Sequence, residues 1–208
     1  GHYNKNTHLI RHGTDWEHFR TAVDEMTSVP AEIAGLPRPI VGFHGLLADW
    51  VDFELIGKIA KANPAGSVVL IGKIAVDAEQ KIKVLDGVNN VHFLGRQPYS
   101  ALPGYCKGFD VAINPFVINE LTLAANPLKV REYLAAGLIT VSTDIPEVRI
   151  LDHCLVAQDH DEFLRHIQTA LSSDKERSEI SDSIRSESWD AKVEELREIV
   201  ARTDSSKA

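Results

Sequence analysis

Six short apolar segments recur along the chain, with polar and helical patterns between them. They are rich in Val and Ile and do not alternate with polar residues, which is typical of strands buried on both faces of a sheet. We predict strands at residues 40–44, 67–71, 91–94, 111–114, 139–142 and 154–157. Amphipathic spacing after the first strand, with Phe53, Ile56 and Ile59 on one side, predicts a helix at 53–62. Further helices are predicted at 15–24, 78–85, 100–106, 127–136 and 161–172.

This alternation of strands and helices predicts an α/β fold with a doubly wound, Rossmann-like parallel sheet of about six strands and right-handed crossovers. Two polar helices follow the core, at 175–186 and 190–202. The second has a thin apolar stripe, made of Val193, Leu196, Ile199 and Val200. Two interpretations stay open: the stripe packs on its own sheet, or it braces a second domain outside this chain.

The length of 208 residues favours a single domain, because domains commonly hold roughly 100–200 residues. We divide it into an N-terminal segment at 1–36, a core at 37–172 and C-terminal helices at 173–208. The chain starts abruptly after Gly1-His2, so we expect a fragment of a longer protein. The first residues are polar, and no apolar run is long enough to cross a bilayer. These features predict a cytoplasmic protein, with the inner face of the membrane as the alternative location of the full-length form.

A formal net charge of −8, from 22 Lys and Arg against 30 Asp and Glu, argues against nucleic acid as a partner. It leaves room for a local basic group that binds an anionic small molecule. The nine histidines form no H-E-x-x-H or similar motif, so we predict no metal site. The sequence also lacks a Walker A motif, a G-x-G-x-x-G after the first strand and a G-x-S-x-G elbow. P-loop nucleotidases, NAD enzymes and hydrolases with that elbow are therefore disfavoured.

Two loops are expected to face the ligand crevice. In an open α/β sheet the crevice lies outside the carboxyl ends of the strands, where the strand order reverses. For the order 3-2-1-4-5-6 this point falls between the first and fourth strands. The loop after the first strand begins at His44, either a ligand-binding or an ordinary loop residue. The loop at 116–126 is unusually long and carries Asn119, Glu120 and Thr122, so it favours a binding role.

The helix that follows the long loop has strong end signals. Asn126 suits the N-cap, Pro127 the first helical position and Gly137 the residue after the C-cap. Its N-terminus should open into the crevice, where free N–H groups and the helix dipole favour an anion. Lys129 in the first turn indicates a phosphate ligand, and Glu132 lies where it could reach a ribose diol. The alternative is an ordinary surface Lys–Glu pair.

Five segments follow one another along the chain in a characteristic order. They are I-R-H-G-T-D-W-E-H-F at 10–19, V-G-F-H-G at 41–45, N-V-H-F-L-G-R-Q-P-Y-S-A-L-P-G-Y at 90–105, F-D-V-A-I-N-P at 109–115 and P-L-K-V-R-E-Y-L-A-A-G-L-I-T-V-S-T-D-I-P-E at 127–147. Together they resemble the C-terminal, donor-binding domain of GT-B fold glycosyltransferases of the large retaining family 4. The resemblance covers nearly the whole chain and implies one half of a GT-B fold. It also implies that the N-terminal acceptor domain lies outside this chain.

The resemblance also implies roles for individual residues. Glu132 corresponds to the glutamate that holds the ribose hydroxyls, and Gly45 to the glycine that admits the diphosphate. Arg96-Gln97-Pro98 corresponds to the loop that holds the base through backbone groups. The expected catalytic residues are Lys129 and Glu120. The expected donor-binding residues are His44, Gly45, Arg96, Gln97, Asn126, Pro127, Leu128, Lys129 and Glu132. No cofactor or metal is expected.

The chain departs from the family pattern in two places. The Arg and Lys that usually follow the first-loop glycine correspond to Leu46 and a residue near Trp50 or Val51, so the diphosphate charge would fall on Lys129. The acidic residue eight positions before Glu132 is replaced by Ala124, and Glu120 is the candidate substitute.

The leading hypothesis is retaining, metal-independent transfer from a nucleotide-diphosphate sugar to an acceptor glycan or lipid-linked sugar in bacterial-type polysaccharide assembly. The fragment alone would bind the donor and transfer little. The alternatives are a non-catalytic nucleotide-binding module, or a nucleotide-sugar epimerase or a phosphorylase of the same fold.

Overall fold

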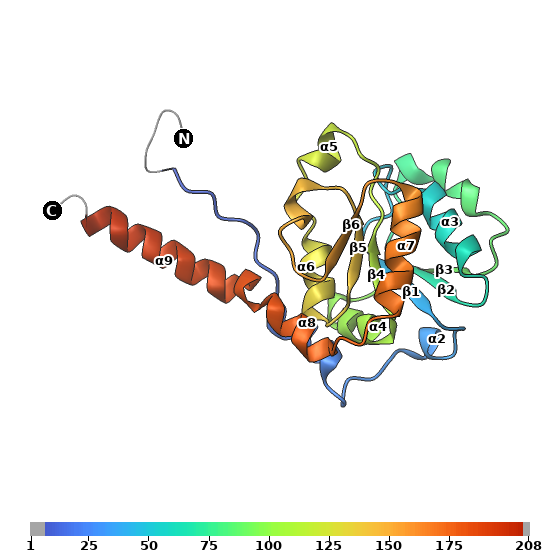
Figure 1. Cartoon of the computed structure of the whole chain (residues 1–208), viewed down its shortest axis with the longest axis horizontal. Coiled ribbons are helices and arrows are strands. Elements are labelled where there is room, and N and C mark those ends of the chain that lie inside the picture. Colours follow the sequence, from blue (N-terminus) through green and yellow to red (C-terminus); the bar gives the residue numbers. More distant parts are fainter. Residues whose placement is uncertain (1–6, 206–208) are drawn as a thin grey trace.

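The computed structural model describes residues 7–205, with side chains up to Arg202. Its core is a six-stranded parallel sheet in the order β3-β2-β1-β4-β5-β6 (Figure 1). The strands are β1 Ile40–His44, β2 Ser67–Ile71, β3 Val91–Gly95, β4 Val111–Asn114, β5 Thr140–Thr143 and β6 Cys154–Ala157. The predicted α/β, doubly wound sheet and its strand order are confirmed.

Burial explains the apolar pattern of the strands. Every residue of β1, β2, β4 and β5 is buried, while the edge strands β3 and β6 are mostly half-exposed. Helices cover both faces of the sheet, so a central strand has no solvent-facing side on which polar residues would be favoured.

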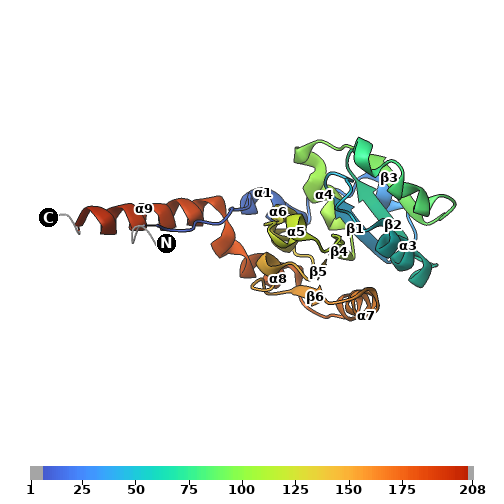
Figure 2. The same ribbon diagram turned by 90° about the horizontal axis from the view of Figure 1, so that it is seen from above.

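The helices form two layers. They are α1 Trp16–Arg20, α2 Ala31–Ala34, α3 Phe53–Ala62, α4 Leu102–Gly108, α5 Glu120–Leu123, α6 Leu128–Ala135, α7 His160–Leu171, α8 Arg177–Ser183 and α9 Trp189–Ser205. The contacts of α3 with α7 place these two on one face, and those of α1 with α4 and α6 place these three on the other (Figures 1 and 2).

Several predicted helices differ from the structure in type or extent. The segment 15–24 is divided between α1 and a 3-10 turn at Thr21–Val23, and 100–106 begins as a 3-10 turn at Tyr99–Ala101. The segment 78–85 forms 3-10 turns at Val76–Ala78 and Lys81–Leu85, in which only Ala78 and Leu85 are buried. So little buried apolar surface does not support a longer helix, because most helical stability in proteins comes from packing. The segment 175–186 is divided between α8 and a separate 3-10 turn at Arg185–Glu187.

The two ends of the described chain extend from the same side of the core (Figure 2). Nearer the core, Trp16 and Phe19 of the N-terminal segment are buried, and the Trp16 indole donates to the carbonyl of Ser181 at 2.8 Å. Beyond this point α9 leaves the core, so it does not pack on its own sheet. Its apolar residues Trp189, Val193, Leu196 and Val200 are each about half exposed. Within the described residues, no helix has both the length and the apolar character needed to cross a bilayer.

Candidate functional site

Three loops are held together at the carboxyl ends of β1, β2 and β3. The Gly45 amide donates to the carbonyl of Ile71 at 2.9 Å, and the Gly72 amide donates to the carbonyl of Gly95 at 2.7 Å. Gly72 has a φ of 147°, and a Cβ there would collide with the Gly45 carbonyl oxygen. Glycine at position 72 therefore allows the first two loops to touch.

A cavity of about 340 Å³ opens between these loops. Its lining residues are His44, Gly45, Leu46, Ile71, Gly72, Lys73, Arg96, Gln97 and Leu102. The structure therefore brings together four of the predicted donor-binding residues, which come from two loops far apart in the sequence. This cavity lies at the sheet edge where ligands of open α/β folds bind.

Lys129 and Glu132 of α6 lie next to the first of these loops. The Cε atom of Lys129 is 2.7 Å from the place that a Cβ on Gly45 would occupy. Its ammonium lies 4.5 Å from the ring centroid of Phe116 and 5.4 Å from that of Phe43. The Glu132 Oε2 atom lies 3.8 Å from Nε2 of His44. Lys129, Glu132 and His44 thus form one cluster, called here the α6 cluster.

The pKa values in the α6 cluster are shifted mainly by burial. Burial lowers the pKa of Lys129 to about 8, against the attraction of Glu132. Burial raises the pKa of Glu132 to about 7; Lys129 opposes this rise and Asp15 adds to it. Burial and the Lys129 charge lower the pKa of His44 to about 3. Shifts of this size among adjacent groups are typical of functional sites.

His44 is neutral near pH 7, and its Nε2 atom is buried without a hydrogen-bond partner among the described residues. Its backbone is fixed, because the Tyr133 hydroxyl accepts from the His44 amide at 2.7 Å and donates to its carbonyl at 3.1 Å. Phe19 stacks on the imidazole with 5.9 Å between ring centroids. A rigid ring with an unsatisfied buried nitrogen is a group that a ligand hydroxyl or a small shift of Glu132 could satisfy.

The N-terminus of α6 is open, but the predicted cap is wrong. Pro127 occupies the N-cap position, and no side chain in the described part of the chain bonds to the first-turn amides. Asn126 instead accepts a 2.6 Å hydrogen bond from Arg131, a fully buried side chain that also pairs with Glu187 at 3.1 Å. The amides of Leu128 and Lys129 have no intrahelical acceptor and are free for an anion.

Glu120 lies apart from the α6 cluster. It is an exposed residue at the start of α5, a one-turn helix closed by a capping box between Asn119 and Thr122. No hydrogen bond or ion pair of the described residues joins its side chain to Lys129 or Glu132. Its catalytic role stays a prediction.

Sequence reasoning missed three residues near the site. Lys73 lines the cavity, the charge of Asp15 acts on Glu132, and the charge of Glu132 acts on Tyr99, whose ring stacks on His18. The signal for Lys73 was the Gly72-Lys73 pair directly after the second strand, which resembles the placement of Gly45 after the first. Asp15 and Tyr99 lie in the family-like segments 10–19 and 90–105, but their places near Glu132 depend on the packing of the N-terminal segment, which no local pattern indicates.

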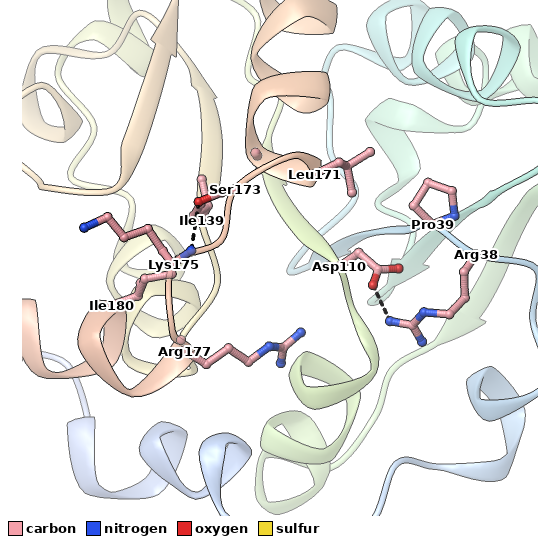
Figure 3. Close-up of a pocket in the computed structure, with 11 residues that line it drawn as sticks. Arg38, Pro39, Asp110, Ile139, Leu171, Ser173, Lys175, Arg177 and Ile180 are labelled. Carbon is pink, nitrogen blue, oxygen red and sulfur yellow. Dashed lines mark hydrogen bonds and ion pairs between the residues drawn. The ribbon is translucent and has the colours of Figure 1, made fainter.

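A larger hollow of about 570 Å³ lies at the opposite, amino edge of the sheet (Figure 3). Arg38 and Asp110 form an ion pair there. Arg177 donates to the carbonyls of Cys106, Lys107 and Phe109 and so completes the C-terminal end of α4. Because these charged groups are engaged in joining chain segments, the carboxyl edge is the better candidate site.

The described residues contain no group of three or more His, Cys, Asp or Glu side chains placed to hold a metal ion.

Comparison with known proteins places this geometry in context. A family model described as glycosyl transferases group 1 matches residues 38–173. TuaH of Bacillus subtilis (strain 168), named for teichuronic acid biosynthesis and glycosyl transfer, is 26% identical over 139 residues, which cover 67% of this chain and 34% of TuaH.

Solved structures show the same fold. A glycosyltransferase from Rickettsia africae superimposes with a TM-score of 0.71 at 13% identity, over 92% of this chain and 56% of that one. The Anabaena protein Alr3699/HepE, solved with UDP and glucose, gives a TM-score of 0.66 at 17% identity, over 96% and 57%. This chain thus spans about a third of the curated relative and little more than half of each of these structures.

Proposed function

Because the chain belongs to the glycosyl transferases group 1 family, we propose that it is the nucleotide-sugar-binding part of a glycosyltransferase. The observation that carries this proposal is the α6 cluster. Lys129 and Glu132 meet His44 and Gly45 beside a helix N-terminus whose first amides are free. A ligand with a phosphate and adjacent hydroxyls matches these groups. The UDP and glucose bound by the Anabaena protein support the same ligand class.

Each part of the site has a task in this proposal. The diphosphate lies at the amides of Leu128 and Lys129, with the Lys129 ammonium beside it. Glu132 accepts hydrogen bonds from the ribose hydroxyls. The base enters the cavity and lies against backbone groups of Arg96 and Gln97, which leaves the Arg96 side chain free of the base, and half-exposed Leu102 supplies apolar surface.

The proposed reaction is retaining transfer of the sugar without a metal ion. The departing nucleoside diphosphate gains negative charge, and fixed amide dipoles with an ammonium stabilise such charge well in a water-poor site. A glycan or lipid-linked sugar of polysaccharide assembly is the proposed acceptor, in line with the biosynthetic role in the name of TuaH. Glu120 would take part only if its loop closes toward the α6 cluster.

The rest of the protein, in this proposal, supplies the acceptor site. The half-exposed stripe of α9 formed by Val193, Leu196 and Val200 is its proposed contact, because helices in proteins gain most of their stability from packing of an apolar face. This chain alone would therefore bind the donor and transfer little.

A second candidate, a non-catalytic nucleotide-binding module, is favoured by one observation. Leu46 follows Gly45 where the family has a basic residue, so the first loop lacks the cation that usually serves the diphosphate. This candidate shares the binding site and differs only in turnover by the full-length protein.

Calorimetric titration of the chain with UDP, GDP and dTDP in the presence of a chelator tests the proposed binding. At least one of the three is expected to bind, because the free amides and Lys129 can take the diphosphate charge without a metal. Binding that appears only after Mg²⁺ or Mn²⁺ is added would refute metal independence. A complete lack of binding in both conditions would refute the proposed function.

A further inference from the structure

Two exposed cations line the cavity between the first three strand ends. Lys73 follows β2, and Arg96 follows β3. Within residues 7–205, neither side chain has a hydrogen-bond or ion-pair partner. By contrast, Arg131 and Arg149 pair with Glu187 and Asp144. Lys73 and Arg96 are therefore available to a ligand, whereas those two arginines are not.

The backbone brings the two cations to the same side of the site. Ile71 pairs with Gly95 in the β2–β3 register, and the Gly72 amide donates to the Gly95 carbonyl at 2.7 Å. Lys73 and Arg96 each directly follow one partner of this bond. None of the residues that line the cavity is acidic, although the chain has a net charge of −8. The cavity is thus a local basic region in an acidic protein.

We propose that Lys73 and Arg96 form the outer half of a phosphate-binding site whose inner half is Lys129 and the N-terminus of α6. This inference rests on the proposed function and specifies how the site takes a polyanionic ligand. Gly45 lies between the halves, since it lines the cavity and also contacts Lys129. In the first loop, apolar Leu46 stands where the family has a basic residue. The outer half supplies the cations that this loop lacks.

The charge of the ligand requires more than Lys129. A diphosphate carries more than one negative charge at neutral pH, and a single buried ammonium with two amides leaves part of that charge unbalanced. Exposed cations add a smaller contribution, because water and salt screen them. The affinity that Lys73 and Arg96 add is therefore expected to increase with the number of phosphates in the ligand. It is expected to decrease as the salt concentration rises.

The test compares Lys73→Ala, Arg96→Ala and the double variant with the parent chain. The probes are the tightest-binding of UDP, GDP and dTDP and the matching nucleoside without phosphates. Each single variant is expected to weaken diphosphate binding by about fivefold at low salt, and the double variant by about twentyfold. Nucleoside binding is expected to stay almost unchanged, and the losses should shrink at moderate salt.

Lys61→Ala and Arg165→Ala are the matched controls. Lys61 on α3 and Arg165 on α7 are both exposed. Their substitution removes the same charge at a place away from the cavity. All variants should melt as the parent does, because no described contact is lost.

Three outcomes would overturn the inference. Equal losses for nucleoside and diphosphate would place Lys73 and Arg96 on the base. Unchanged diphosphate binding in the double variant would refute the outer half while leaving the proposed function standing. A parent chain that binds none of the ligands would refute the proposed function, and this inference with it.

Discussion

Replacing Lys129 by alanine is expected to lower the affinity for a nucleoside diphosphate by roughly ten- to a hundredfold. A charge-assisted contact is worth about 1.5–3 kcal/mol, and each 1.4 kcal/mol is about tenfold. The empty protein should be as stable as the parent or slightly more so. Burial lowers the pKa of this lysine to about 8, so its charge is unfavourable in the fold, and a cation in the first turn opposes the helix dipole.

Calorimetric titration and thermal melting, each with and without nucleotide, measure the two effects. Lys129→Met is the matched variant, since it keeps a long unbranched side chain and removes the charge together with its cation–π contacts to Phe43 and Phe116. Both variants should lose binding to the same extent. A variant that melts well below the parent and still binds nucleotide as tightly would show that Lys129 is structural.

Replacing Glu132 by glutamine is expected to weaken nucleoside diphosphate binding by about 1.5–3 kcal/mol and to leave inorganic diphosphate binding almost unchanged. The carboxylate can accept from two ribose hydroxyls, whereas an amide has one acceptor oxygen and no charge. Inorganic diphosphate lacks the hydroxyls, so it is the internal control for the phosphate half of the site. Equal losses for both ligands would move Glu132 away from the ribose.

The same variant has a distinct pH signature in the absence of ligand. Burial raises the pKa of Glu132 to about 7 from a usual value near 4.5. Between these values the unfolded chain binds fewer protons than the folded one, so stability falls as the pH rises, by up to about 3 kcal/mol. Glu132→Gln should remove this loss.

His44 contributes a pH dependence of stability of the opposite sign, so the variant is compared with the parent. Its pKa is lowered to about 3, so the unfolded chain binds the extra proton and stability rises with pH up to about 6.5. Urea unfolding of both proteins at about pH 5 and about pH 7 measures their stability, and the difference between parent and variant is the contribution of the Glu132 carboxyl. Parallel pH profiles for parent and variant would show that Glu132 is ionised normally in the fold.

The fold was largely predictable because the strands are buried on both faces. In β1, the run from Ile40 to His44 is buried throughout, and such a run has few interpretations other than a central parallel strand. Periodicity was less reliable where burial is thin. The segment 78–85 contains enough apolar residues to suggest a helix, but only Ala78 and Leu85 are buried.

The site was predictable only in part. Lys129, Glu132 and Gly45 meet as the spacing on α6 and the strand order indicated. Asn126 did not cap α6, because Arg131 is buried beside it and takes its side-chain oxygen. A long-range contact of this kind leaves no local pattern. Lys73 had a local signal, the Gly72-Lys73 pair after β2, but its place in the cavity also depends on the long-range hydrogen bond between Gly72 and Gly95.

Hydrogen exchange with and without the tightest-binding nucleotide tests most directly whether the ligand lies at the carboxyl edge of the sheet. Peptides that cover residues 44–47, 95–98 and 126–132 are expected to exchange more slowly at saturating nucleotide, because the ligand covers the first three loops and the free amides of α6. The peptides at the amino edge, around Arg38 and Arg177, should exchange unchanged. Protection confined to that amino edge, with the three carboxyl-edge peptides unaffected, would contradict a donor site at the α6 cluster.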